Sequence, residues 1–157
     1  MSAYMTAELA KKAIDLASPS IKETLNLVAK RFAGHLRVSS RVDGEWTTLA
    51  TRDFGDPSVW EGDYKRHATG KETISQRTGL SSREVQLLYP ELLEPGDTVY
   101  YGSVVSPGGT IVVAFSGVEA YFDEMFAKLV LAAILALIQH TLELQKAAGL
   151  ETFAAAA

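Results

Sequence analysis

The chain contains no cysteine, and this absence excludes several kinds of chemistry. Without a thiol there is no disulfide, no thiolate nucleophile, no iron–sulfur cluster and no cysteine-ligated zinc. Basic residues are also in deficit, since 15 lysines and arginines stand against 19 aspartates and glutamates, for a formal net charge of −4. We therefore expect no bulk attraction to nucleic acid or to an anionic membrane.

Long apolar runs are scarce. The longest, Leu129–Ile138, has ten residues, about half of the roughly 20 needed to cross a bilayer. The N-terminal segment alternates charged residues with alanine and does not have the pattern of a signal peptide. We expect a cytoplasmic protein without a membrane partner. The 157 residues, 47% of them hydrophobic, predict one domain over residues 1–150 and a frayed tail over 151–157.

Apolar residues at helical spacing predict an N-terminal helix over Thr6–Ala17. Ser18-Pro19 follows, and serine at the N-cap with proline at the first helical position is typical of a helix start. We therefore expect either a second helix over Pro19–Phe32 or one kinked helix through both segments. A last helix is predicted over Tyr121–Ala148, apolar on most sides and buried in the core or at a subunit interface.

Two further helix starts are predicted from the capping-box pattern S-x-x-E, in which serine and glutamate satisfy each other's backbone donors. The first lies at Ser58–Glu61 and opens a helix that would carry a basic cluster, although Gly62 and Gly70 weaken it. The second lies at Ser81–Glu84 and opens a short helix through about Tyr89.

Two hairpins are predicted. The first joins His35–Val42 to Glu45–Arg52 through Asp43-Gly44, a pair typical of the type I′ turn, with one apolar and one polar face. The second joins Val99–Val105 to Thr110–Phe115. Hairpins with helices segregated around them predict an α+β fold, an antiparallel sheet of four or five strands with flanking helices in a profilin-like or PAS-like architecture.

The order of motifs resembles the GlcG/HbpS-like family, also called the haem-degrading-domain family. The matching residues are LAKKAI at 9–14, GSVV at 102–105, IVVAFSG at 111–117, and Asp123-Glu124. The plain Asp43-Gly44 turn departs from the family's Asp-x-Gly-Gly. The resemblance implies a PAS-like fold that often assembles into homo-oligomers, and it implies that some members bind haem or another tetrapyrrole.

Candidate ligand-binding residues lie in two places. Lys65, Arg66 and His67, with Lys71 nearby, form a basic cluster that could hold an anion, or else a solvated helix face. Ser116 and Gly117 precede the last helix and could shape an anion site at its start, or else serve as a strand-to-helix cap. We place the ligand pocket between the sheet and the basic helix.

The remaining candidate residues give weaker evidence of a function. The chain has three histidines, His35, His67 and His140, and none has the spacing of a dedicated metal site. Ser116 lacks the first glycine of the G-x-S-x-G nucleophile elbow, which argues against a serine hydrolase of that type. Asp123 and Glu124 could act in acid–base chemistry, but the helix dipole alone favours acids there.

These observations support three hypotheses. The first is a cytoplasmic, homo-oligomeric protein that binds a small anionic ligand, with haem as the cofactor that the family resemblance implies. The second is a ligand-free homo-oligomeric accessory or structural subunit. The third is an enzyme acting on a small organic acid, with His67 as base.

Overall fold

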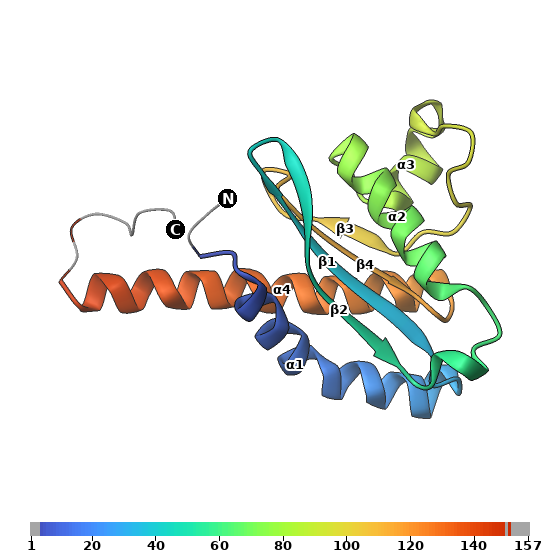
Figure 1. Ribbon diagram of the computed structural model, residues 1–157, viewed down its shortest axis with the longest axis horizontal. Helices are drawn as coiled ribbons and strands as arrows, with labels where there is room; N and C mark the ends of the chain where they lie inside the picture. Colours follow the sequence, from blue (N-terminus) through green and yellow to red (C-terminus); the bar gives the residue numbers. More distant parts are fainter. Residues whose placement is uncertain (1–3, 150, 152–157) are drawn as a thin grey trace.

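The computed structural model describes residues 4–149 and 151 and shows an α+β fold (Figure 1). The helices are α1 (Ala7–Thr24), α2 (Tyr64–Thr78), α3 (Ser82–Leu88) and α4 (Ala120–Ala147), and the strands are β1 (Gly34–Val42), β2 (Glu45–Phe54), β3 (Ser103–Val105) and β4 (Ile111–Ser116). Short turns complete the chain: η1 (Leu25–Ala29), η2 (Pro57–Val59) and η3 (Pro90–Leu92). The four strands form one antiparallel sheet in the order β2-β1-β4-β3, as predicted. Apart from Glu151, the predicted tail at 151–157 lies outside the described residues.

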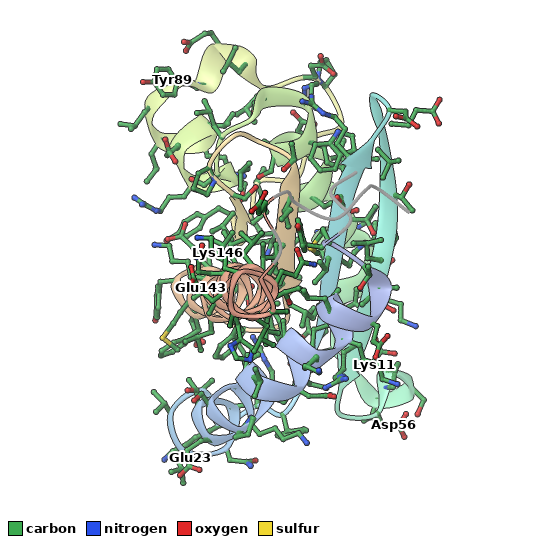
Figure 2. The ribbon with its side chains drawn as sticks, turned by 90° about the vertical axis from the view of Figure 1, so that its left-hand side faces the viewer. Lys11, Glu23, Asp56, Tyr89, Glu143 and Lys146 are labelled. Atoms are coloured by element: carbon green, nitrogen blue, oxygen red, sulfur yellow. The ribbon has the colours of Figure 1, made fainter. Side chains whose placement is uncertain are left out.

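The sheet lies between two helical layers. Helices α1 and α4 cover one face, and α2, with α3 beside it, covers the other (Figures 1 and 2). The apolar core lies between the sheet and the α1–α4 layer, where the ring of Phe115 packs against Phe54 and Phe126 at centroid distances of 5.7 and 4.9 Å. The opposite face of β1 is also buried, because α2 covers His35 and Ser39. The polar face of β1 is therefore covered by a helix.

The N-terminal region forms one helix rather than two. Pro19 lies inside α1, which changes direction along its length and continues into the π-helical turn η1 (Figure 1). The kinked-helix alternative is therefore confirmed, and a separate helix beginning at Pro19 was wrong. Proline removes one backbone hydrogen bond, and beside it the Ser18 hydroxyl donates to the carbonyl of Ile14 at 2.7 Å.

The first hairpin is confirmed. Val42 pairs with Glu45, and Asp43 and Gly44 have φ angles of 50° and 81°, the positive values that a type I′ turn requires. A register shift between Val38 and Ser39 interrupts the ladder.

The two capping boxes differ in outcome. The Ser81 hydroxyl accepts the Glu84 backbone N–H at 3.1 Å and begins α3, as predicted. A helix beginning at Ser58 was wrong, because only the short turn η2 forms there. Helix α2 begins at Tyr64 instead, after Asp63, whose carboxylate accepts the Arg66 N–H at 3.2 Å.

The second hairpin is shorter than predicted. Strand β3 begins at Ser103, so Val99 to Gly102 are not strand residues. Their backbone groups bond to α3 instead: the Gln86 amide donates to the carbonyls of Thr98 and Tyr100, and the Ser82 hydroxyl accepts the N–H of Gly102. This loop brings Tyr100 over α2, where it lines the site described below.

Helix α4 extends beyond the sheet (Figure 1). Its buried residues lie between Asp123 and Ile134, so the predicted burial on most sides holds only for its first half. Tyr4 accompanies the second half and donates its hydroxyl to Gln145 Oε1 at 2.9 Å. Farther along the exposed side, Leu144 is 57% exposed.

Of the helices in the described part of the chain, α4 alone is long and apolar enough to cross a bilayer, and 28% of its apolar stretch is buried. The apolar run Leu129–Ile138 is shorter than the apolar part of α4 because the run includes only uninterrupted apolar residues. One such helix is weak evidence for a membrane span, since core helices of soluble proteins share these properties.

Candidate functional site

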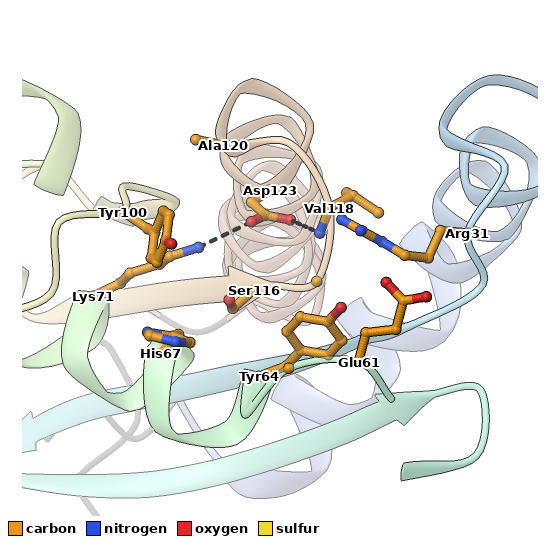
Figure 3. A pocket seen from close by; sticks show the side chains of 12 residues that line it. Arg31, Glu61, Tyr64, His67, Lys71, Tyr100, Ser116, Val118, Ala120 and Asp123 are labelled. Carbon is orange, nitrogen blue, oxygen red and sulfur yellow. Dashed lines mark hydrogen bonds and ion pairs between the residues drawn. The ribbon is translucent and has the colours of Figure 1, made fainter. Parts of the chain in front are cut away.

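A cavity of about 330 Å³ lies between α2, the start of α4 and the loop that precedes β3 (Figure 3). Lys71 and Asp123 meet at its centre, beside Ser116. His67 and Tyr100 lie at one end, and Arg31, Glu61 and Tyr64 at the other. A concave site with convergent polar groups is the usual form of a small-molecule pocket.

The central feature of the cavity is a buried ion pair. Lys71 Nζ donates to Asp123 Oδ2 at 2.9 Å, and the two side chains are 1% and 2% exposed. The same ammonium donates to the carbonyl of Phe115 at 2.9 Å, and Asp123 Oδ1 accepts the N–H of Val118 at 3.1 Å. The pair therefore joins α2, the end of β4 and the start of α4.

Burial acts on both charges of this pair. Removal from water disfavours the ionised form of each group, so burial lowers the pKa of Lys71. Burial raises the pKa of Asp123 to about 6, although the Lys71 charge and the backbone N–H groups of Val118 and Gly117 oppose the shift. At pH 7 the Asp123 carboxyl is ionised and close to its titration range.

Two glycines allow the elements around the pair to approach so closely. A Cβ on Gly102 would lie 2.7 Å from the Phe115 carbonyl oxygen and 3.0 Å from Lys71 Nζ, and a Cβ on Gly117 would lie 2.3 Å from the Ala33 carbonyl oxygen. Any side chain at either position would force backbone apart. Gly117 thus brings the β4–α4 loop against the start of β1.

His67 lies on the cavity face of α2. Its ring packs edge-on against Tyr100, with centroids 5.1 Å apart, and its Nδ1 lies 3.4 Å from Thr98 Oγ1. Partial burial, followed by the charges of Arg66 and Lys71, lowers the pKa of His67. At neutral pH this imidazole is therefore uncharged, which suits it as a hydrogen-bonding or proton-accepting group.

The structure places the predicted site residues around two adjoining hollows, and His67 lines both. His67, Ser116 and Gly117 line the cavity together. Lys65 and Arg66 do not line it: Lys65 Nζ lies 3.5 Å from Asp53, and Arg66 lies 3.6 Å from Asp63. These two side chains line an adjoining groove of about 600 Å³ on the outer side of α2, which His67 and Tyr100 also line.

Sequence reasoning missed the cavity residues Arg31, Glu61, Tyr64 and Tyr100, and named Lys71 and Asp123 without pairing them. Helical spacing offered one signal, because Tyr64, His67 and Lys71 are separated by three and four residues and so share a face of α2. Arg31 lies in the connection between η1 and β1, and no spacing in the sequence indicates its position.

The residues that line this cavity can be compared with what a bound haem requires. His67 offers a neutral imidazole as a ligand, and Arg31 offers a cation for a propionate. However, about 330 Å³ is at the small end of ligand pockets. Within residues 4–149 and 151, no three histidine, aspartate or glutamate side chains gather in a way that could hold a metal ion.

No family model matches the chain, and no curated protein matches it. The resemblance to the GlcG/HbpS-like family therefore stays a prediction from its motifs.

Proposed function

We propose that this chain is a cytoplasmic small-ligand-binding protein and that its cavity binds a small organic anion, such as a mono- or dicarboxylate. One observation carries the proposal: polar groups without a protein partner converge on one cavity around a buried ion pair. In the described part of the chain, no carboxylate lies within 4.0 Å of the exposed Arg31 guanidinium, and the hydroxyls of Ser116 and Tyr64 have no hydrogen-bond partner.

The positions of these groups favour a carboxylate. An arginine can bind both oxygens of a carboxylate through two parallel hydrogen bonds. Arg31 and the Tyr64 hydroxyl lie at one end of the cavity, with Ser116 between them and His67 (Figure 3). The start of α4 adds to this field, because Ala120 lines the cavity and the N-terminus of a helix favours negative charge.

The buried pair also suits such a role. A buried ion pair is a poor source of stability because desolvation offsets most of its attraction, and perturbed ionisable groups in a cleft are typical of functional sites. Asp123 keeps Lys71 oriented beside Ser116, so the ammonium and the carboxylate together give the cavity wall a fixed dipole. A small acid would therefore meet this oriented pair as well as the exposed guanidinium of Arg31.

Calorimetric titration with acetate, pyruvate, succinate and citrate tests the proposal, together with native mass spectrometry of the freshly purified protein. We expect saturable binding of at least one acid. Arg31→Ala should weaken it about tenfold, in line with the loss of a charged hydrogen bond of about 1.5–3 kcal/mol. Arg66→Ala is the matched comparison, because this arginine lies outside the cavity, and it should change binding less than twofold.

A hemin titration completes the experiment. A saturable shift of the haem absorption band that His67→Ala abolishes would favour the tetrapyrrole that the family resemblance implies. Absence of binding by every acid, or equal losses from Arg31→Ala and Arg66→Ala, would contradict the proposed site.

A second candidate function rests on α4. This is the ligand-free homo-oligomeric accessory subunit, and it is favoured by apolar residues such as Leu135 and Leu144, which α4 leaves exposed beyond the sheet. A second copy of the chain could cover this face. The whole-molecule prediction below tests it.

A further inference from the structure

Three side chains lie in one row across the end of the sheet. In the strand register, His35 on β1 pairs with Asp53 on β2 and with Ser116 on β4. Directly paired residues of antiparallel strands project on the same face, with Cβ atoms about 4.5–5.5 Å apart. The order across the sheet is therefore aspartate, histidine, serine, on the face that α2 covers.

The histidine is held by the aspartate. His35 Nδ1 lies 2.6 Å from Asp53 Oδ1, and the His35 side chain is 5% exposed. Asp53 Oδ2 is itself 3.5 Å from Lys65 Nζ. With Nδ1–H donated to the carboxylate, the proton position is fixed and Nε2 is left with its lone pair.

The other ring nitrogen of His35 is buried and, within the described residues, has no hydrogen-bond partner. A buried polar atom of this kind calls for an explanation, since nearly all such atoms are satisfied. The two nitrogens of an imidazole point in widely different directions, so bonding Nδ1 to β2 directs Nε2 away from that strand. Ser116 is the neighbour of His35 on the opposite side, on β4.

Ser116 is the third residue of this row. It is the last residue of β4, it lines the cavity, and within the described residues its hydroxyl makes no hydrogen bond. Although the G-x-S-x-G pattern is absent, the serine still stands between a strand and a helix, which is where a nucleophile elbow places it. Catalytic serine–histidine contacts are often long in a protein without substrate.

We propose that Ser116 is a nucleophile activated by His35 and Asp53, and that the protein hydrolyses an ester of a small organic acid. This deepens the proposed function, on which it rests, because the acid that the cavity binds would be the product. In this proposal His35, and not His67, accepts the proton of the Ser116 hydroxyl. His67 then contributes to substrate binding.

The chemical steps balance with water as the only co-reactant. Ser116 Oγ attacks the ester carbonyl while its proton passes to His35 Nε2, and a bond forms between Oγ and the carbonyl carbon. The bond to the alkoxy group then breaks, and the imidazolium gives its proton to the departing alcohol. Water attacks the acyl-serine with its proton passing to His35, which returns a proton to Ser116 as the acid leaves.

The groups around His35 and Ser116 favour both the acylation and the deacylation of the serine. Burial lowers the pKa of His35 more than the Asp53 hydrogen bond and charge raise it, and the charges of Arg37 and Lys65 lower it further, so the imidazole is uncharged at pH 7 and can accept a proton. Lys71 Nζ contacts the carbonyl of Phe115, the residue before Ser116. This ammonium and the Asp123 carboxylate paired with it therefore lie beside the proposed nucleophile.

Acylation of the full chain tests this inference. The probes are 4-nitrophenyl acetate and a fluorophosphonate, followed by intact-mass measurement and peptide mapping. We expect one acyl or phosphonyl group per chain, located on Ser116 and absent from Ser116→Ala. His35→Gln should slow acylation about 100-fold, the usual contribution of a general base, whereas His140→Gln on α4 should react at the wild-type rate.

Asp53→Asn is a second variant in case His35→Gln fails to fold. It leaves His35 in place but removes the charge that orients it, and we expect a comparable loss of rate with an unchanged circular-dichroism spectrum. A label on any other residue, no label at all, or wild-type rates in folded His35→Gln and Asp53→Asn would overturn the inference.

The binding proposal is separated from this one by titrating Ser116→Ala with the same carboxylates. If that variant and the wild type bind an acid but the wild type is never acylated, the binding site stands and the nucleophile is wrong. If the wild type is acylated on Ser116 but binds no acid, the nucleophile stands and the assignment of the acid to this cavity fails.

Discussion

At the scale of the residue, the buried pair of Lys71 and Asp123 is the most consequential feature. It joins the helix that bears His67 to the end of the strand that bears Ser116, so it holds the two sides of the cavity together. Neither residue is free to ionise as it would in water, since burial opposes the charge of both.

Lys71→Met tests the pair through stability. The substitution leaves the Asp123 carboxylate buried without its cation, and breaking a buried pair in this way costs about 3–5 kcal/mol. Lys65→Met is the matched control on the same helix, because Lys65 is 55% exposed and an exposed pair contributes about 0–1 kcal/mol. Urea denaturation of both variants measures the difference, and equal losses would contradict the account.

The ionisation of Asp123 can be observed directly. We expect its carboxyl carbon to titrate near pH 6 in an NMR experiment, against 3.8 for an unperturbed aspartate. Because the folded-state pKa is raised, the contribution of this group to stability is full below about pH 3.8 and is lost as the pH rises through about 6. Lys71→Met should raise the pKa of Asp123 further, and titration near pH 4 in the wild type would contradict the burial argument.

At the scale of the element, α2 and the β4–α4 connection position the site together, and glycine sets how closely they meet. The Cβ of an alanine at position 102 would collide with the Phe115 carbonyl oxygen and with Asp123. These atoms belong to backbone and to the buried pair, so they cannot move aside independently.

Gly102→Ala should therefore destabilise the fold by about 1–3 kcal/mol, the usual range for overpacking. Gly70→Ala is the control: it lies inside α2, where alanine is favoured over glycine by roughly 1 kcal/mol, and its Cβ would meet only Thr98 side-chain atoms, at 3.3 and 3.4 Å. Thermal and urea unfolding measure the change in the free energy of unfolding for each substitution. We expect the two changes to have opposite signs or to differ by at least about 1 kcal/mol.

The sequence predicted those elements whose signal is local. The Asp43-Gly44 turn and the Ser81 capping box depend on adjacent residues and are confirmed. The Ser58 box was wrong because Asp63 caps α2 instead, five residues later. Residues Val99 to Gly102 have the composition of a strand, but distant side chains of α3 take up their backbone groups.

The site was harder to predict than the fold for the same reason. Lys71 and Asp123 are 52 residues apart, and only the packing of α2 across β4 brings them together. His67, Ser116 and Gly117 could be named from the sequence because each lies beside a recognisable feature, a basic cluster or a strand end. The row formed by Asp53, His35 and Ser116 depends on the register of three strands, which the hairpin pattern alone does not give.

At the scale of the whole molecule, the second half of α4 is the unexplained feature, because it leaves apolar residues exposed beyond the sheet. If a second copy covers this face, light scattering after size-exclusion chromatography should give the mass of an oligomer. Leu135→Glu with Leu144→Glu should then yield a monomer. The matched variant Leu87→Glu with Leu88→Glu, on the exposed side of α3, should leave the mass unchanged, and a monomeric wild type would contradict the oligomer.

The most direct test of the central claim is a map of amide chemical shifts during titration with a small carboxylate. The account predicts saturable changes confined to the cavity, at residues such as Arg31, His67, Gly117 and Val118, with the outer groove at Thr73 and Gly96 unaffected. Changes centred on that outer groove, or no saturable change with any acid tested, would contradict it.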